Sequence, residues 1–163
     1  MADNHPATDR LRALLGADKV LSTDLWREIY ARDASYFDIR PECVARPSTP
    51  DEVRHVMDTA RRYGLGVTFR TGGTSLSGQT VGSGIICELR TQWRDYEVRD
   101  GGRRIWFQPG LTARQVNEIL KPHHHRIGPD PASSQAAMMG GILSNNSSGM
   151  TAGVRYNSYH TLH

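Results

Sequence analysis

The residues best suited to chemistry in this sequence form a run of small residues, Arg70-Thr71-Gly72-Gly73-Thr74-Ser75-Leu76-Ser77-Gly78-Gln79. Gly72 and Gly73 can adopt positive φ, which turns successive backbone N–H groups toward one point. Such a nest binds phosphate oxygens without a lysine. A tight strand-to-strand turn is the alternative, but a glycine pair and a third glycine with interleaved hydroxyls exceed what a turn requires. The hydroxyl groups that add further donors belong to Thr74, Ser75 and Ser77.

This run matches neither of the common nucleotide-binding loops. It lacks the GxxxxGK[ST] pattern of the Walker A loop, and it does not open a helix as GxGxxG does in a dinucleotide fold. Residues 78–84 continue as loop. A nucleotide would therefore be held by loops between strands. Ser75 has neither a GxSxG context nor an evident His/Asp pair, so we expect no hydrolase nucleophile.

A second stretch, 127–153, is rich in Pro, Ser, Asn and Gly. It is too rich in small residues for ordinary core and too patterned for a random linker. Its marked groups are Gly128-Pro129-Asp130-Pro131, Met139-Gly140-Gly141-Ile142 and Asn145-Asn146-Ser147-Ser148-Gly149.

We expect no metal or redox site. The side chains of His123-His124-His125 point to alternate faces of an extended segment, so they suit one ion poorly, and a solvated loop after Pro122 is expected. Cys43 and Cys87 show no CxxC spacing and are expected to be buried free thiols. The carboxylates to which no paired site is assigned are Asp33, Asp38 and Glu42. The tryptophans expected in the core, rather than stacked on a cofactor, are Trp26, Trp93 and Trp106.

The composition excludes several classes of partner. The chain has 163 residues and a formal net charge of +3. It has no extended run of Lys or Arg, so neither nucleic acid nor an anionic membrane surface is an expected partner. No stretch approaches the roughly 18 apolar residues of a transmembrane helix. The N-terminal residues lack the pattern of a signal peptide, and with two unpaired cysteines this favours a cytoplasmic location.

Capping signals indicate the elements that position the glycine run. Thr49-Pro50-Asp51-Glu52 predicts a helix start with a capping box, and Gly64 ends that helix. A buried strand over 66–70 follows. With a strand over 44–46 this makes one βαβ unit, and the glycine run leaves the carboxyl end of its second strand, where open α/β sheets bind ligands. The expected inward face of the helix is Val53, Val56, Met57 and Ala60.

Further elements flank this unit. The remaining expected elements are a helix over 8–15 capped by Thr8 and stopped by Gly16, a helical piece over 22–30, an irregular connection over 31–43, and a second set of strands over 84–89, 96–98 and 104–108. Asp100-Gly101-Gly102 makes the turn of a hairpin between the last two strands. Thr112 and Gln115 predict a capping box for a helix that ends before Pro122.

The order of these motifs resembles a known flavoprotein family. The run from Arg70 to Gln79 resembles the diphosphate-binding loop of the vanillyl-alcohol oxidase / p-cresol methylhydroxylase (PCMH) family. The nearest branch holds D-lactate dehydrogenase, glycolate oxidase and D-2-hydroxyglutarate dehydrogenase. The segments that resemble its second FAD-binding part are Asp130-Pro131-Ala132-Ser133-Ser134, Gly140-Gly141, Ser147-Ser148-Gly149 and the pair Arg155-Tyr156.

The resemblance implies an α+β, PCMH-type FAD-binding domain of two α/β subdomains. It assigns 1–43 to a helical lead-in and 44–163 to the domain, which is expected to be incomplete at its C-terminus. Thr74 stands where some members link a His to the flavin, so FAD is expected to bind non-covalently. The implied cofactor-binding residues are Arg70, Thr71, Gly72, Gly73, Thr74, Ser75, Leu76, Ser77, Gln79, Asp130, Pro131, Ser134, Gly140, Gly141, Ser148 and Gly149.

The resemblance also implies a function, a flavin-dependent oxidoreductase acting on a 2-hydroxy acid such as D-lactate, glycolate or D-2-hydroxyglutarate. The family's substrate-binding and proton-abstracting residues belong to later parts of the chain, so no catalytic or metal-ligating residue is expected here, and the chain alone should be inactive. A non-catalytic FAD- or nucleotide-binding module and the flavin reductase of peptidoglycan precursor synthesis are the alternatives. Uncovered sheet edges and an apolar cleft would favour self-association.

Overall fold

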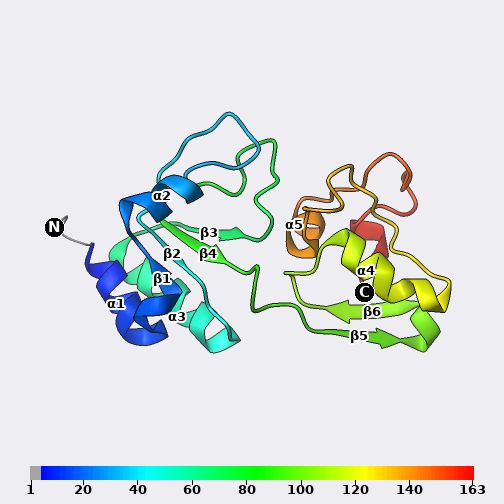
Figure 1. The fold of residues 1–163 in the computed structure, drawn as a ribbon, viewed down its shortest axis with the longest axis horizontal. Coiled ribbons are helices and arrows are strands. Elements are labelled where there is room, and N and C mark those ends of the chain that lie inside the picture. Colours follow the sequence, from blue (N-terminus) through cyan, green and yellow to red (C-terminus); the bar gives the residue numbers. More distant parts are fainter. Residues whose placement is uncertain (1–4) are drawn as a thin grey trace. The chain divides into compact units, whose positions relative to one another are not determined.

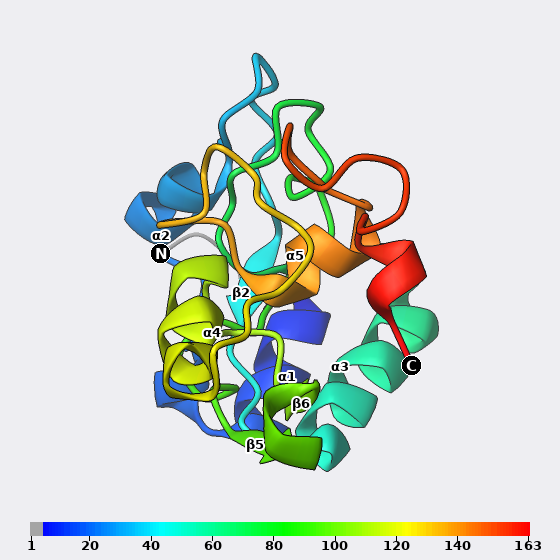
Figure 2. The ribbon, with the colours of Figure 1, turned by 90° about the vertical axis from the view of Figure 1, so that its right-hand side faces the viewer.

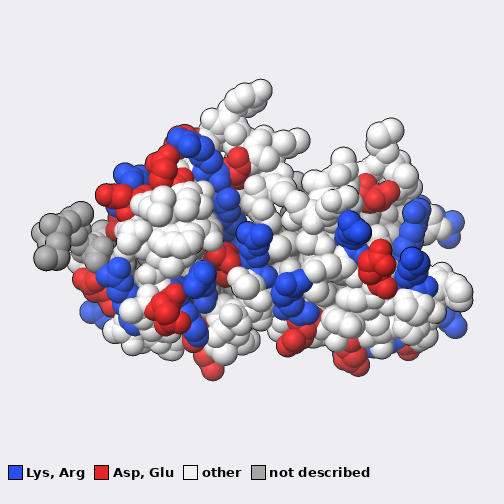
Figure 3. Space-filling view, viewed as in Figure 1, with Lys and Arg blue, Asp and Glu red and all other residues white. Residues whose placement is uncertain are grey.

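The computed structural model describes residues 5–163, which form two compact units divided between Leu89 and Arg90 (Figure 1). The N-terminal unit holds a four-stranded sheet with three α-helices, and the C-terminal unit holds a two-stranded sheet with two. Positive and negative side chains are interspersed over the face of both units seen in Figure 3. No helix among the described residues is long and apolar enough to cross a membrane.

The sheet of the N-terminal unit has the strand order β1-β2-β4-β3. β2, β4 and β3 are parallel, whereas β1 pairs with β2 in the antiparallel sense. The predicted βαβ unit is confirmed, but β4 lies between its two strands. The strands are β1 (Val20–Leu21), β2 (Cys43–Ala45), β3 (Val67–Arg70) and β4 (Ile85–Glu88).

Two predictions about these strands are wrong. Residues 84–89 were expected to open a second set of strands, yet β4 is the central strand of this sheet and is buried along its whole length. The strand over 66–70 was expected to be buried, yet β3 is an edge strand and Phe69 is 46% exposed. A continuous apolar run such as Ile85-Ile86-Cys87 is typical of a parallel strand covered on both faces.

Helices α1 (Pro6–Leu15) and α3 (Pro50–Tyr63) pack together against the sheet, while α2 (Asp24–Tyr30) leads toward β2 (Figure 1). The cap predicted for α1 is wrong: His5 Nδ1 accepts the Ala7 N–H at 3.1 Å, and Thr8 lies buried in the first turn. Trp26 on α2 is 37% exposed and not in the core. The core of this unit is formed by Leu11, Leu15, Val20, Cys43, Ala45, Val56, Ala60, Ile85 and Cys87, so the segment before residue 44 packs into it.

Helix α3 begins and ends where predicted, with one change at its cap. Thr49 Oγ1 accepts the Glu52 N–H at 3.2 Å, and Gly64 ends the helix with φ 66°. The Glu52 carboxylate, however, accepts from the Ser48 N–H at 2.7 Å and from Lys19 Nζ at 2.6 Å, so the reciprocal half of the capping box is displaced by one residue. The buried positions of α3 are Val56, Thr59 and Ala60, and the predicted Met57 is exposed.

The C-terminal unit begins with the predicted hairpin, β5 (Tyr96–Arg99) and β6 (Arg104–Phe107). Side chains alternate along β6, so Trp106 points outward and is 48% exposed, against the prediction of a core position. Helix α4 (Ala113–Leu120) carries the predicted capping box, with both hydrogen bonds between Thr112 and Gln115.

Helix α5 (Met139–Ser144) was not predicted, because its two glycines have low helix propensity. It is fixed by burial of Met139 and Ile142 in the core of this unit. Figure 2 presents the C-terminal unit toward the viewer, with α4 and α5 labelled. The histidines from His123 to His125 are exposed after α4, as expected of a solvated loop. The 3-10 helices of the described residues are Ala17–Lys19, Asp100–Gly102, Lys121–His123 and Tyr159–Thr161.

Candidate cofactor-binding site

The glycine loop, residues 71–84, leaves the carboxyl end of β3 and leads back into β4 (Figure 1). Because β2, β3 and β4 are parallel, their carboxyl ends share one edge of the sheet. The loop therefore lies where open parallel sheets place their ligands, as predicted.

The backbone conformation of the loop differs from the prediction at one glycine. Gly73 has φ 65° and Gly78 has φ 74°, whereas Gly72 is not in the positive-φ region. One residue in the left-handed region is enough to reverse the direction of successive N–H groups. The left-handed glycines of the loop are thus Gly73 and Gly78, and not the Gly72-Gly73 pair.

The hydroxyl of Ser75 organises the second half of the loop. Its Oγ accepts the N–H groups of Ser77 and Gln79, each at 3.2 Å, and donates to Gln79 Oε1 at 3.0 Å. Ser75 was expected to donate to a phosphate, but its proton is used inside the loop here. The N–H groups of 71–76 have no hydrogen-bond acceptor among the described residues. These are the donors that an anion would find.

Arg70, at the last position of β3, points inward beneath the loop. Its guanidinium donates to the carbonyls of Tyr30 at 3.2 Å, Arg32 at 2.9 Å and Thr80 at 3.4 Å. A Cβ atom added at Gly73 would lie 2.7 Å from Nη2 of this group. A glycine at position 73 therefore permits two things, the left-handed backbone and the close packing on Arg70.

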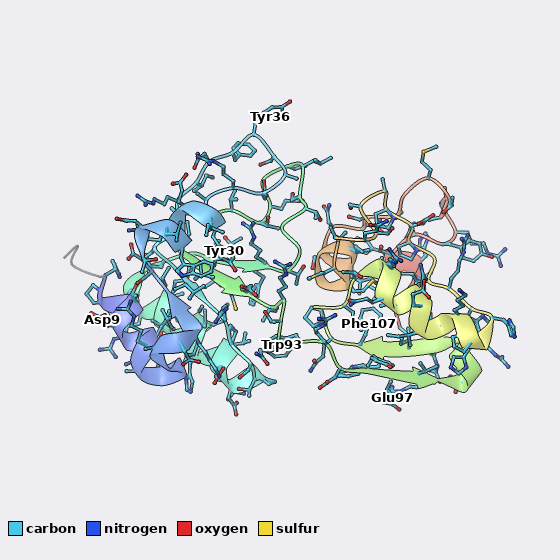
Figure 4. All side chains as sticks on the ribbon, in the orientation of Figure 1. Asp9, Tyr30, Tyr36, Trp93, Glu97 and Phe107 are labelled. Carbon is cyan, nitrogen blue, oxygen red and sulfur yellow. The ribbon has the colours of Figure 1, made fainter. Side chains whose placement is uncertain are left out.

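A tyrosine and a buried carboxylate complete this end of the sheet. Arg70 and Glu88 are partners in the register of β3 and β4, and Glu88 is 5% exposed. The Tyr30 hydroxyl donates to Glu88, and the Arg70 guanidinium lies 5.1 Å from the centre of the Tyr30 ring. Burial, reinforced by the hydrogen bond to Glu88, raises the pKa of Tyr30 above its usual value. Figure 4 labels Tyr30 at this end of the sheet.

The connection over 31–42 also supports the loop, a role that the sequence did not reveal. Asp33 Oδ2 accepts the Thr80 hydroxyl at 2.9 Å, and Asp33 Oδ1 accepts the Ser35 N–H at 2.8 Å. Partial burial would raise the pKa of Asp33, but the hydrogen bonds from Ser35 and Thr80 outweigh it and lower that pKa. The Phe37 ring packs so closely on Gly78 that a Cβ atom there would overlap it. An Asp followed two residues later by Ser is typical of an Asx turn, the one local signal for this segment.

The predicted second segment lies in the C-terminal unit, where it folds back on itself. The Asp130 N–H donates to the Ser148 carbonyl at 2.7 Å, and Asp130 bridges Gly149 in the parallel sense. Gly149 has φ 75°, and a Cβ atom on it would overlap the Asp130 carbonyl. The Thr151 hydroxyl donates to Asp130 Oδ2 at 2.9 Å. The structure thus brings Asp130, Pro131, Ser148 and Gly149 together.

The other predicted residues of this segment lie at helix starts. The Ser134 carbonyl accepts the Arg114 N–H at 3.1 Å in the first turn of α4. Gly140 and Gly141 lie in the first turn of α5, and the Gly140 N–H donates to the Pro109 carbonyl at 3.0 Å. These backbone groups are fixed by neighbouring segments of their own unit.

The chemical groups that the glycine loop offers are neutral donors, which suit an anion and not a metal ion. The described residues hold no group of three or more His, Cys, Asp or Glu side chains that could ligate a metal ion. The donors at the glycine loop are backbone amides, and the guanidinium that packs on Gly73 is itself engaged by carbonyls. Backbone amides without protein acceptors, beside glycines of positive φ, are a combination that suits a diphosphate.

Comparison with known proteins identifies relatives of this chain. The model of the FAD binding domain family matches residues 41–163. The chain is 30% identical over 127 residues to D-2-hydroxyglutarate dehydrogenase from Pseudomonas putida, a match that covers 76% of this chain and 13% of that protein. It is 27% identical over 118 residues to glycolate oxidase subunit GlcD from Escherichia coli, covering 71% of this chain and 24% of that protein. The chain therefore spans a small part of these relatives.

Solved structures share the fold at low identity. An alkyldihydroxyacetonephosphate synthase gives a TM-score of 0.79 at 19% identity, over 95% of this chain and 33% of that one. p-Cresol methylhydroxylase with substrate bound gives 0.70 at 17% identity, over 86% of this chain and 29% of that one. These likenesses confirm the predicted α+β, PCMH-type fold.

Proposed function

This chain belongs to the FAD binding domain family, and from that membership we propose that its glycine loop holds the diphosphate of a non-covalently bound FAD. The observation that carries the proposal is the set of N–H groups over 71–76, which lack acceptors among the described residues and lie at the carboxyl edge of a parallel sheet. Thr74 offers no ring nitrogen for a covalent link to the flavin.

The proposed contacts follow from the two segments. Backbone amides from Thr71 to Ser77 hold the diphosphate. The Ser77 N–H does so after it gives up its hydrogen bond to the Ser75 hydroxyl. Arg70 acts at the base of the loop. The residues proposed to lie along the cofactor are Gly72, Gly73, Thr74, Ser75, Leu76, Gln79, Asp130, Pro131, Ser134, Gly140, Gly141, Ser148 and Gly149. We retain 44–163 as the FAD-binding part and 1–43 as its lead-in.

The reaction that we propose for the complete protein is oxidation of a 2-hydroxy acid such as D-lactate, glycolate or D-2-hydroxyglutarate. When bound, FAD supplies a ring that accepts a hydride. The residues of this chain bind and orient the cofactor. The names of the relatives, D-2-hydroxyglutarate dehydrogenase and glycolate oxidase subunit, support the substrate class. The alternative that we keep for this chain is a non-catalytic FAD-binding module.

A titration of the purified protein with FAD, followed by quenching of flavin fluorescence, tests the proposal. Gly73→Val should abolish FAD binding, because the side chain would strain a left-handed backbone and displace Arg70. Gly64→Ala is the matched control, since Gly64 has the same left-handed conformation with open space around it. Unchanged FAD affinity in Gly73→Val would move the diphosphate site elsewhere, and failure of the folded wild type to bind FAD would reject the function.

A further inference from the structure

We propose that Arg70 is a positioning residue for the diphosphate, one that holds the glycine loop through backbone carbonyls and does not touch the phosphate oxygens. This inference rests on the proposed function. It gives Arg70 a role that the residue types of the loop do not suggest. An arginine beside a glycine-rich phosphate loop is more simply expected to bind the phosphates itself.

The hydrogen bonds of the guanidinium argue for the positioning role. Its two Nη groups donate to three backbone carbonyls, those of Tyr30, Arg32 and Thr80. The Tyr30 carbonyl belongs to the last residue of α2, the Arg32 carbonyl follows that helix, and the Thr80 carbonyl belongs to the second half of the loop. The planar guanidinium fork can bridge several acceptors at once, whereas an ammonium group cannot hold the same arrangement. Arg70 thereby joins the end of β3 and the loop at Thr80 to residues 30–32, which lie about 40 positions earlier in the sequence.

The packing around the guanidinium points the same way. Tyr30 covers one face of Arg70, with 5.1 Å from Cζ to the ring centre. Gly73 covers another side, since any Cβ atom there would meet Nη2 and Nε. The buried carboxylate of Glu88 lies opposite Arg70 in the strand register. The positive charge is thus held by carbonyls and packed beside Gly73 of the loop, where it can favour a bound anion without direct contact.

A second tie acts on the far end of the loop. Thr80 donates its hydroxyl to Asp33, and Phe37 packs on Gly78. With Arg70 at the near end, the loop is held at both ends by the single segment 30–37. A loop fixed before the ligand arrives spends less conformational entropy on binding, so loss of either tie should weaken affinity for the diphosphate.

Arg70→Lys separates positioning from direct contact. Lysine keeps the positive charge and binds phosphate well as a point charge, but it cannot bridge the three carbonyls. The measurements are the affinities of wild type, Arg70→Lys and Arg70→Met for FAD and for ADP, and hydrogen exchange of amides over 71–80. Arg61→Met is the control, because Arg61 is an exposed arginine of α3.

Both Arg70 variants should weaken FAD and ADP binding by at least about tenfold, the factor that corresponds to ordering roughly one backbone residue. Exchange of the Ser77 and Gln79 amides, which donate to Ser75 Oγ, should accelerate while the amides of β2 and β4 keep their wild-type rates, which general destabilisation would not produce. Thr80→Val, which removes one hydroxyl at the far tie, should give a smaller change in the same direction. It also provides a test if Arg70→Met fails to fold.

Three outcomes would overturn parts of this scheme. Wild-type affinity in Arg70→Lys, beside a loss in Arg70→Met, would make Arg70 a direct phosphate ligand. Unchanged exchange of the Ser77 and Gln79 amides in both variants would remove its positioning role. Wild-type protein that binds neither FAD nor ADP would reject the proposed function itself.

Discussion

At the scale of single residues, Gly73 and Gly149 are required for different reasons. Both have positive φ, but a Cβ atom on Gly73 would meet the end of a side chain, whereas one on Gly149 would overlap the backbone carbonyl of Asp130. A side chain can move aside, and a bridged backbone cannot do so without breaking the bridge. Gly149 is therefore the less replaceable of the two.

We predict that Gly149→Ala destabilises the C-terminal unit by about 3 kcal/mol, the sum of left-handed strain and overpacking. The matched control is Gly153→Ala, which has φ 56° and open space, and should lose only about 1 kcal/mol of strain. Urea unfolding followed by tryptophan fluorescence measures both losses. Equal losses for the two variants would show that the contact with Asp130 is unimportant.

The sequence indicated where the backbone must be special, but not which contact makes it so. The glycine run and the Ser148-Gly149 pair were both identified from local residue types. Their supports were not, because Arg70 bonds to Tyr30 and Arg32, about 40 positions earlier, and no local pattern reports such a contact. The direction of a side chain at the end of an edge strand depends on which segment covers it.

At the scale of elements, capping chemistry was predictable and strand order was not. The ends of α3 and α4 follow from Thr49, Gly64 and the Thr112–Gln115 box, all of which act within a few residues. The central place of β4 depends on pairing with β2 and β3, which lie far away in sequence. Burial of α2 was not predictable either, since its apolar residues Leu25 and Ile29 are exposed despite their helical spacing.

The central strands lead to a prediction about alkaline pH. Burial raises the pKa of Cys43 in β2 to about 11 and that of Cys87 in β4 to about 12, so both thiols stay neutral in the native state. In the unfolded chain they ionise near pH 8.5. The contribution of the two buried, neutral thiols to the free energy of unfolding is therefore complete below about pH 8.5. It is lost as pH rises toward the native pKa values.

We predict that the free energy of unfolding falls between about pH 8.5 and 10, by up to about 1.4 kcal/mol per pH unit for each thiol. The double variant Cys43→Ala/Cys87→Ala should be less stable at neutral pH but should show a shallower fall. Urea unfolding at a series of pH values provides the measurement. An identical slope in wild type and variant would mean that other groups govern the alkaline loss.

At the scale of the whole molecule, the chain consists of two units with separate cores and separate sheets. Only the family resemblance predicted two subdomains. The composition could not, because no linker-like stretch marks the division between Leu89 and Arg90. The segment from Arg90 to Asp95 that joins the units lies outside the strands, and its two arginines are exposed.

We predict that brief digestion with trypsin cuts first after Arg90 or Arg94, and that both products resist further cleavage. Exposed backbone outside strands and helices opens to proteases at the lowest cost in free energy. Mass spectrometry of the first products identifies the cut. Arg90→Gln/Arg94→Gln should slow cleavage there without changing the sites cut later. An initial cut inside α3 or β4 would contradict two independently compact units.

The C-terminal unit has a groove of about 1080 Å³ that opens onto its core. Its apolar lining comes from Ile105, Phe107, Leu120, Ile127, Met139 and Leu143, and its basic lining from Arg99, Arg103, Arg104, Arg126 and Arg155. β5 and β6 pair with no further strand among the described residues, so both edges of the hairpin can accept another strand. Apolar surface beside free strand edges favours association, while the arginines oppose it in like-charged copies.

We therefore predict that the protein self-associates through this unit, and does so more strongly at high salt. Raising the ionic strength from about 0.1 M to about 1 M shortens the screening length from about 10 Å to about 3 Å, which weakens repulsion between the arginines and leaves apolar attraction intact. Sedimentation velocity over a range of concentrations measures the association. Arg103→Glu should strengthen it at low salt by lowering the positive charge of the groove. A monomer at every concentration, or association that weakens as salt rises, would show that the groove is not a contact between copies.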